Sequence, residues 1–416
     1  MTMAADKQDK VLNCSSEREQ SGACSSSAER EKNQGKNFLN VPTLRFPEFS
    51  GDWKESTIGK KFELYSGNTP SRLDKENFVG DVNWITSGEL KDHYIGDTKE
   101  KISENSVKEN NLRLLPEGTF VIAIYGLEAE GVRSTGSIIT KQSTISQACM
   151  AFTPKGDISN EFLYSWYKKH GNVIGIRYAQ GTKQQNLSYD ILEKFKIRYP
   201  SLKEQDKLNS FISLLDTRIA TQNRIIEDLK QLRSAIRNRI FKKIQQEPEQ
   251  IVQIKEILTY EQPTKYLVSN TEYVDDSSLI PVLTANKAFI LGYTFEKQGV
   301  YDKGDCIILD DFTLDCKIVD FPFKVKSSAI KILRAKNRNM LRYAFEYLKY
   351  LDLETSEHKR HYIAEIEPID ISLPSQEKIE DIIHLFESLD MRIVNAEKTW
   401  SSYLSQKQFL LQTLFI

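Results

Sequence analysis

The sequence contains one helix opening twice, as "PSLKEQDKLNSFISLLDTRI" at residues 200–219 and "PSQEKIEDIIHLFESLDMRI" at residues 374–393. Both copies begin with Pro-Ser and end with Leu-Asp-x-Arg-Ile, 174 positions apart. The offset holds to the end of the chain, where "RIF" at 239–241 matches "TLF" at 413–415. A repeat of this kind indicates that one structural unit occurs twice.

Apolar residues in both copies follow the alternating steps of four and three that form a coiled-coil seam. The predicted seam residues are Leu208, Ile212, Leu215, Ile219, Ile226, Leu229 and Ile236, then Ile382, Phe386, Leu389, Ile393, Trp400, Tyr403 and Leu410. Each helix would have about 40 residues and a length of about 60 Å. Two matched stripes of this length can cover each other, so we predict an antiparallel pair; two separate amphipathic helices are the alternative.

A pseudo-twofold axis between the halves would fix which residues of the two helices meet. It places Gln222 and Ile226 near Ala396 and Trp400, at the middle of the pair. It also separates Arg233 and Lys407, which interrupt the two stripes at the same step.

The segments that precede the helices are also related, but their offset drifts. "WITSGEL" resembles "PVLTANK" at an offset of 198, "PEGTFVIA" resembles "DKGDCIIL" at 186, and "EFLYSWY" resembles "MLRYAFEY" at about 179. "TFVIAIYG" and "DCIILDDF" are typical of buried strands after a turn that contains glycine, and the tyrosine-rich segments of amphipathic helices. The drift indicates loops of different length on a shared framework.

These patterns predict an α+β chain with two mixed α/β domains, two long antiparallel helices and an internal pseudo-twofold repeat. The predicted segments are a tail at 1–40, a first domain at 41–199, a central helix at 200–247, a second domain at 248–373 and a C-terminal helix at 374–416. The tail is rich in Ser, Lys, Glu, Gln and Asn, so we expect it to be disordered.

Composition limits the function classes. The 416 residues include 57 Lys and Arg against 58 Asp and Glu, so a polyanion must be bound by local patches. No apolar run approaches the ~20 residues of a membrane span and the N-terminus lacks the apolar core of a signal peptide, so we expect a cytoplasmic protein. Five scattered cysteines without a CxxC pair fit a reducing compartment, with neither a disulfide framework nor a zinc site.

The sequence contains no phosphate-binding GxxxxGK[ST], no Gly-rich nucleotide turn and no HExxH. "DDFTLDCK" at 310–317 resembles a metal-dependent nuclease motif, but Asp311 and Asp315 are too close for a strand-hairpin-strand, so we predict a strand-end turn with solvated charge. His358 and His361 have a helical ligand spacing among cations that would repel a metal, which favours a basic contact loop. We therefore expect no catalytic residue, metal or cofactor in this chain.

Several segments together resemble the specificity subunit of type I restriction-modification systems. They are "VPTLRFPEFSGDWKESTIGKKFELYSGNTPSR" at 41–72, "YAQGTKQQNLSYDILEKFKIRYPS" at 178–201 and the two LDxRI helices. The resemblance covers nearly everything after residue 40 and is weaker in the second domain. Residues 1–40 depart from the short N-terminus of the family.

The resemblance implies a non-catalytic DNA-binding subunit for phage defence. In this family each of two target-recognition domains reads half of a split site in double-stranded DNA, and the helices act as a ruler between them. The implied partners are two modification subunits, which use S-adenosylmethionine to methylate adenine, and two restriction subunits, which use ATP and Mg²⁺. A coiled-coil scaffold without DNA binding and a stand-alone metal-dependent nuclease are the alternatives.

Candidate DNA contacts are polar residues in the predicted turns and loops. The turn at 66–72, which matches the family's Gly-x-Thr-Pro-Ser element, offers Asn68, Thr69, Ser71 and Arg72, and the loop "GTKQQN" offers Thr182, Lys183, Gln184, Gln185 and Asn186. Further candidates are Thr86, Ser87, Tyr125, Arg133, Lys141 and Gln142 in the first domain, and Thr284, Asn286, Lys287, Lys317, Lys324, His358, Lys359, Arg360, His361 and Tyr362 in the second. The alternative for each is a plain polar turn or solvated surface.

Overall fold

A computed structural model describes residues 40–125, 134–178, 187–284, 289–353 and 360–416. The chain divides into two compact units, residues 1–205 with 413–416, and residues 206–412. The predicted domain boundaries stay predictions, because this division groups most of both long helices with the second domain. In the described ranges, none of the helices is long and apolar enough to cross a membrane.

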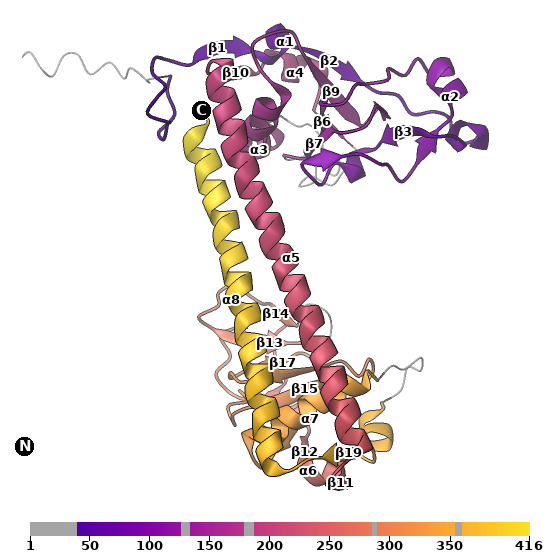
Figure 1. The fold of residues 1–416 in the computed structure, drawn as a ribbon, viewed down its shortest axis with the longest axis vertical. Helices are drawn as coiled ribbons and strands as arrows, with labels where there is room; N and C mark the ends of the chain where they lie inside the picture. Colours follow the sequence, from indigo (N-terminus) through magenta and orange to yellow (C-terminus); the bar gives the residue numbers. More distant parts are fainter. Residues whose placement is uncertain (1–39, 126–133, 179–186, 285–288, 354–359) are drawn as a thin grey trace, which may run out of the picture. The chain divides into compact units, whose positions relative to one another are not determined.

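The first unit is built on a five-stranded sheet with a smaller sheet beside it (Figure 1). The larger sheet has the order β2 (Phe62–Ser66), β9 (Cys149–Pro154), β6 (Phe120–Ala123), β7 (Gly136–Ile139) and β4 (Tyr94–Ile95). The smaller sheet has the order β5 (Lys101–Ile102), β3 (Val82–Ile85) and β8 (Ser143–Ile145), and β1 (Lys54–Thr57) pairs with β10 (Lys196–Tyr199). The helices are α1 (Ile58–Lys61), α2 (Glu104–Glu109), α3 (Asn160–Tyr178) and α4 (Tyr189–Lys194).

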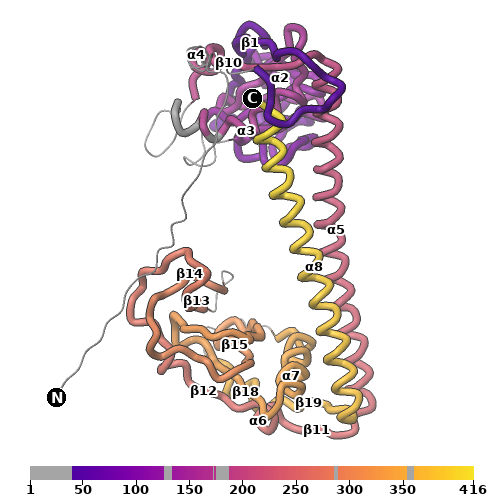
Figure 2. The backbone as a smooth tube through the Cα atoms, turned by 90° about the vertical axis from the view of Figure 1, so that its left-hand side faces the viewer, coloured from indigo at the N-terminus to yellow at the C-terminus, as the bar shows by residue number. Residues whose placement is uncertain are grey.

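The second unit repeats this plan with fewer strands. Its larger sheet has the order β12 (Leu258–Glu261), β18 (Ile330–Ala335), β15 (Cys306–Asp310) and β16 (Cys316–Val319). Its smaller sheet has the order β14 (Ile290–Thr294), β13 (Ile280–Leu283) and β17 (Lys324–Val325), and β11 (Gln250–Gln253) pairs with β19 (Asp370–Leu373). Here α6 (Ile254–Ile257), α7 (Arg338–Leu351) and a π-helix (Tyr362–Ile366) complete the domain, and α7 lies between the larger sheet and the long helices (Figure 2).

Equivalent elements of the two units form the shared framework that the drifting sequence offset predicts. β3 and β13 each pair in parallel with the strand that follows later in the chain, β8 and β17 respectively. The central strands β6 and β15 are buried along their whole length. Each follows a glycine with a left-handed backbone, Gly118 at φ +79° and Gly304 at φ +88°, a conformation that disfavours other residues. A shared framework with loops of different length therefore describes both domains.

The long helices α5 (Leu202–Gln246) and α8 (Gln376–Leu414) run antiparallel in the second unit. Gln222 Nε2 donates to the carbonyl of Ala396 at 3.1 Å, which confirms the predicted midpoint. Arg233 Nε bonds Asp390 at 2.5 Å, and Lys407 bonds Asp216. Asp216 and Asp390 are equivalent positions of the repeat, as are Arg233 and Lys407. The two ion pairs are therefore equivalent to each other and lie on opposite sides of the pseudo-twofold axis.

The predicted seam faces the interior of the pair along most of its length. Leu208, Ile212, Leu215, Ile226, Phe386, Leu389, Ile393 and Leu410 are buried, while Ile219, Leu229, Ile236, Ile382, Trp400 and Tyr403 are half-buried. At the start of α8 the buried positions are Ile379 and Ile383, on either side of the predicted Ile382. The seam at that end is therefore shifted by one position, because α8 there packs on the core of the second domain.

Candidate nucleic-acid interface

The predicted turn at residues 66–72 is held against the end of β8. A side chain at Gly67 would place its Cβ 1.8 Å from the carbonyl oxygen of Ile145, so only glycine fits there. The Asn68 amide donates to the same carbonyl at 3.2 Å, and the Trp84 indole donates to the carbonyl of Asn68 at 3.1 Å. Asn68 and Ser71 are exposed, whereas Thr69 is half-buried and its amide is bonded to the Asn68 side chain at 2.8 Å. The turn is thus rigid and presents short polar groups.

Arg72 follows this turn and is 59% exposed, but its guanidinium is already bound. Nη1 and Nη2 each donate to one oxygen of Glu100 at 2.8 Å, and the guanidinium carbon lies 4.9 Å from the ring centre of Phe78. The hydrogen bond from Arg72 lowers the pKa of Glu100 below its usual value of 4.5. A DNA phosphate at Arg72 must therefore compete with a charged, bidentate carboxylate.

The other first-domain candidates differ in availability. Thr86 donates its hydroxyl to Glu89 at 2.8 Å and Ser87 is buried, so both serve the local fold and we omit them from the proposed interface. Tyr125 is half-buried and burial raises its pKa. Lys141 and Gln142 are exposed, and Lys141 pairs with Asp97 at 2.8 Å. Arg133, Thr182, Lys183, Gln184, Gln185 and Asn186 lie outside the described residues.

In the second domain two predicted contacts point inward. Lys324 is buried, pairs with Glu296 at 2.9 Å and donates to the carbonyl of Gln298 at 2.6 Å. Thr284 is also buried, at the end of β13. Lys317 is half-buried with its ammonium 4.4 Å from the ring centre of Phe289. We therefore omit Lys324 and Thr284 from the interface and retain Lys317, while Asn286 and Lys287 lie outside the described residues.

The cationic run before the π-helix also contains both exposed and buried residues. Arg360 is exposed, whereas Tyr362 is fully buried and His361 is buried with its Nδ1 2.8 Å from Glu365. His358 and His361 cannot be compared as a metal pair, because His358 and Lys359 lie outside the described residues. Of the described residues, no group of three or more His, Cys, Asp or Glu could hold a metal ion.

The loops "GTKQQN" and "EHKRHY" occupy equivalent places in the chain. The first connects α3 to α4 and β10, and the second connects α7 to the π-helix and β19. The amide of Leu187, at the end of the first connection, donates to the carbonyl of Ile124 at 2.8 Å. The amide of His361, at the end of the second, donates to the carbonyl of Asp311 at 3.2 Å. The described residues at the end of the two connections, Leu187 and His361, are therefore bonded to the residue that follows the central strand of their domain.

The turn "DDFTLDCK" differs from the expectation of solvated charge. Asp311 is almost completely buried and Asp310 nearly so. The Asp310 carboxylate accepts the Phe312 amide at 2.9 Å, and Asp311 faces the ammonium of Lys331 at 3.2 Å. The acidic pair is thus structural, which was not predictable because its partner Lys331 lies on a different strand.

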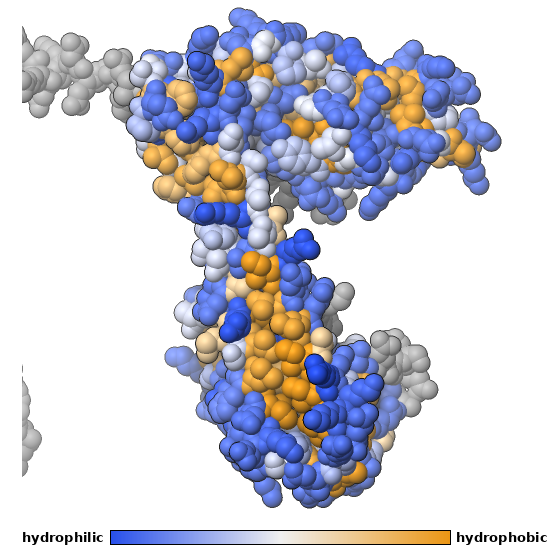
Figure 3. All heavy atoms as spheres, viewed as in Figure 1, coloured by the Kyte–Doolittle hydropathy of each residue, from blue (hydrophilic) through white to orange (hydrophobic). Residues whose placement is uncertain are grey.

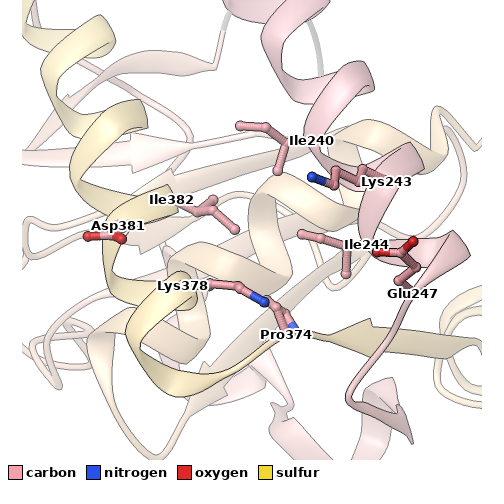
Figure 4. Close-up of a pocket in the computed structure, with 8 residues that line it drawn as sticks. All are labelled: Ile240, Lys243, Ile244, Glu247, Pro374, Lys378, Asp381 and Ile382. Atoms are coloured by element: carbon pink, nitrogen blue, oxygen red, sulfur yellow. The ribbon is translucent and has the colours of Figure 1, made fainter.

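A cleft of about 310 Å³ lies between the end of α5 and the start of α8, within the second unit. Ile240, Ile244 and Ile382 line it (Figure 4), with Lys243, Glu247, Lys378 and Asp381 around them. Figure 3 shows apolar residues gathered in a band over this helix pair. An apolar floor with mixed charges at its rim suits a protein segment better than a polyanion.

Comparisons of the sequence with known proteins agree with one another. Residues 50–231 match the model of a type I restriction modification DNA specificity domain. The chain is 42% identical over 166 residues to the EcoR124I/EcoR124II specificity subunit of Escherichia coli, and 30% identical over 185 residues to the MjaIX specificity subunit of Methanocaldococcus jannaschii. These alignments cover 37% and 43% of this chain, and 41% and 42% of the relatives, so less than half of either relative's length is matched.

Two solved structures share the fold over nearly the whole chain. The S subunit from M. genitalium has a TM-score of 0.55 at 17% identity, covering 90% of this chain and 99% of its own. A chain from a structural study of complex assembly in the type I R-M system also has a TM-score of 0.55, at 14% identity, covering 87% and 97%. Residues 50–231 therefore match the DNA specificity domain of type I restriction-modification systems, and the chain shares the fold of these two solved structures.

Proposed function

We propose that this chain reads a bipartite, interrupted DNA site, with one half-site bound by each domain and the helix pair acting as the spacer. The observation that carries the proposal is the difference between the two kinds of repeat. The helices keep a fixed offset of 174 and are locked by equivalent ion pairs, whereas the domains keep a topology and vary their loops. A spacer must not vary, and recognition loops must vary to read different bases.

The length of the helices suits this role. The 45 residues of α5 correspond to about 68 Å at ~1.5 Å per residue. Two turns of duplex span about 68–72 Å, so a spacer of this length would let two domains reach major grooves on one face of DNA.

The available side chains are of the types that bind DNA. In the first domain Asn68, Ser71, Lys141 and Gln142 are exposed, and Arg72 becomes available if a phosphate displaces Glu100. In the second domain Arg360 is exposed and Lys317 is half-buried. Amide side chains such as those of "GTKQQN" can pair with adenine through two hydrogen bonds, and the cations can bind phosphates.

Methylation and cleavage would belong to partner subunits. In this proposal two modification subunits with S-adenosylmethionine methylate adenine, and two restriction subunits with ATP and Mg²⁺ translocate and cut DNA. The chain itself would be non-catalytic. The apolar cleft between α5 and α8 offers a protein-binding surface to such a partner.

Methylation mapping of a host with and without this chain tests the proposal. The expected result is adenine methylation, dependent on the chain, at two half-sites separated by a constant gap. A scaffold would leave the methylation pattern unchanged and show no sequence-dependent DNA affinity. A stand-alone nuclease would instead cut DNA as a purified chain when a divalent metal is added.

A further inference from the structure

Asp311 ties the end of a loop to the central strand of the second domain. It directly follows β15 and is only 1% exposed. Its Oδ1 accepts the backbone amides of His361 at 3.1 Å and Tyr362 at 2.8 Å. Its main-chain carbonyl also accepts the His361 amide, at 3.2 Å. Three contacts from one residue thus fix the backbone immediately after Arg360.

The carboxylate of Asp311 is itself held by a buried cation. Lys331, on β18, is 2% exposed and places its ammonium 3.2 Å from Oδ2. The same ammonium donates to the hydroxyl of Tyr260 at 3.1 Å, and the rings of Tyr260 and Tyr362 lie 5.7 Å apart. The pair therefore connects β15, β18 and the start of the π-helix in one geometry.

The first domain shows that the fold does not need this ion pair. At the equivalent places the residues are Ile124, directly after β6, and Met150 on β9, because the Ile124 amide donates to the Ala148 carbonyl as the Asp311 amide does to the Ala329 carbonyl. There, among the residues that the structure describes, a bond from the Leu187 amide to the Ile124 carbonyl holds the loop end. A buried ion pair loses hydration that its mutual attraction only partly restores, and its attested use is to select one arrangement. In the described residues, the second domain thus has a charged anchor at the place where the first has a backbone bond.

We propose that Asp311 is a positioning residue for recognition of the second half-site. By fixing His361 and Tyr362 it presents Arg360, which is exposed, to DNA in one orientation. This inference rests on the proposed function of the chain. Asp311 would not touch DNA itself, since it is buried.

The test uses the full chain with its modification partner and DNA duplexes that carry the mapped site. Competition binding compares the intact site with duplexes substituted in either the first or the second half-site. In Asp311→Asn the amide can still accept a backbone N–H, but Lys331 loses its counter-charge. We expect discrimination at the second half-site to fall by about tenfold, with discrimination at the first half-site unchanged.

A matched control and a second variant separate positioning from folding. Asp315→Asn makes the same change four residues later, in a half-exposed carboxylate that pairs with Lys349, and should leave both discriminations unchanged. Asp311→Asn with Lys331→Met removes both charges and reproduces the methionine of the first domain, so it should recover a large part of the loss.

The outcomes are distinct. Selective loss at the second half-site with recovery in the double variant supports the proposal. Equal loss at both half-sites, or unchanged discrimination in a folded Asp311→Asn chain, overturns it and leaves Asp311 a purely structural residue. If the wild-type chain fails to discriminate at either half-site, it is the proposed function that falls.

Discussion

Glu204, in the first turn of α5, holds the start of that helix to the N-terminal segment. Its side chain is 3% exposed and binds Arg45 through two bonds of 2.7 Å, while the Trp53 indole donates to it at 3.2 Å. The hydrogen bond that Arg45 donates to Glu204 raises the pKa of the Arg45 guanidinium. The neighbouring Leu44 amide donates to the carbonyl of Thr413, so this segment also contacts the end of α8 within the first unit.

Glu204→Gln should cost about 3 kcal/mol of unfolding free energy. Removing one partner from a buried ion pair costs roughly 3–5 kcal/mol, because the remaining charge is left without compensation. The lower figure applies here because Arg45 keeps its bond to the Gly51 carbonyl and glutamine can still accept from Trp53. In a unit of this size that loss corresponds to a fall in Tm of about 6–12 °C.

Urea and thermal unfolding of the full chain, followed by tryptophan fluorescence, measure the effect. The internal repeat supplies a control, since Lys378 is the counterpart of Glu204 and is 66% exposed with Glu249 at 3.4 Å. Lys378→Gln should cost less than about 0.5 kcal/mol. Arg45→Met combined with Glu204→Gln should recover part of the loss. A loss below about 1 kcal/mol, or equal losses in Glu204→Gln and Lys378→Gln, would refute the reasoning.

Four further predictions concern DNA binding and the spacer. Glu100→Gln should release Arg72, raise DNA affinity and steepen the salt dependence of binding by about one phosphate contact. The control variant Glu109→Gln should change neither quantity. In the wild type the same release of Arg72 needs acidification below about pH 4.5, because the pKa of Glu100 is lowered. Gln184→Ala should reduce discrimination at one half-site by roughly 1–3 kcal/mol, whereas Lys183→Ala should weaken binding to all sequences in a salt-titrated assay. One heptad inserted into both helices should lengthen the methylated gap without changing the half-sites, and changed half-sites would contradict a passive spacer. Residues 41–247 should form a homodimer that directs methylation to an interrupted palindrome; a strict monomer in light scattering at tens of micromolar would show that the symmetry is only a relic of duplication.

The repeat, the strands and the helix pair were predictable because they depend on periods along the chain. The fixed offset of 174 and the seven-residue apolar period were enough to predict antiparallel helices meeting near Gln222 and Ala396. The glycines at 118 and 304 marked the turns before both central strands because their backbone conformation restricts the residue type.

The direction of polar side chains was not predictable in this way. The sequence predicts a surface position for Lys324. In the structure it lies on the two-residue strand β17 and pairs with Glu296, and only the pairing of the strands reveals this. Arg72 and Glu100 are 28 positions apart, and no period relates them. Polar residues in loops therefore identify a region of interest, while their availability depends on partners that only the fold brings near.

Some polar contacts occur in only one half of the repeat and therefore distinguish the two domains. Arg233 and Arg237 both bind Glu346 of α7, at 2.5 and 2.8 Å, and so join α7 to α5 in the second unit. Burial raises the pKa of Glu346 to about 7 although the Arg233 charge opposes this. Since a buried ion pair is weak evidence for net stability, we expect this network chiefly to fix the orientation of α7. The counterparts of Arg237 and Glu346 in the repeat are Leu411 and Tyr167, which cannot form such a pair. The framework is thus common to both halves, whereas Glu346 and the Asp311–Lys331 pair give the second domain a geometry of its own.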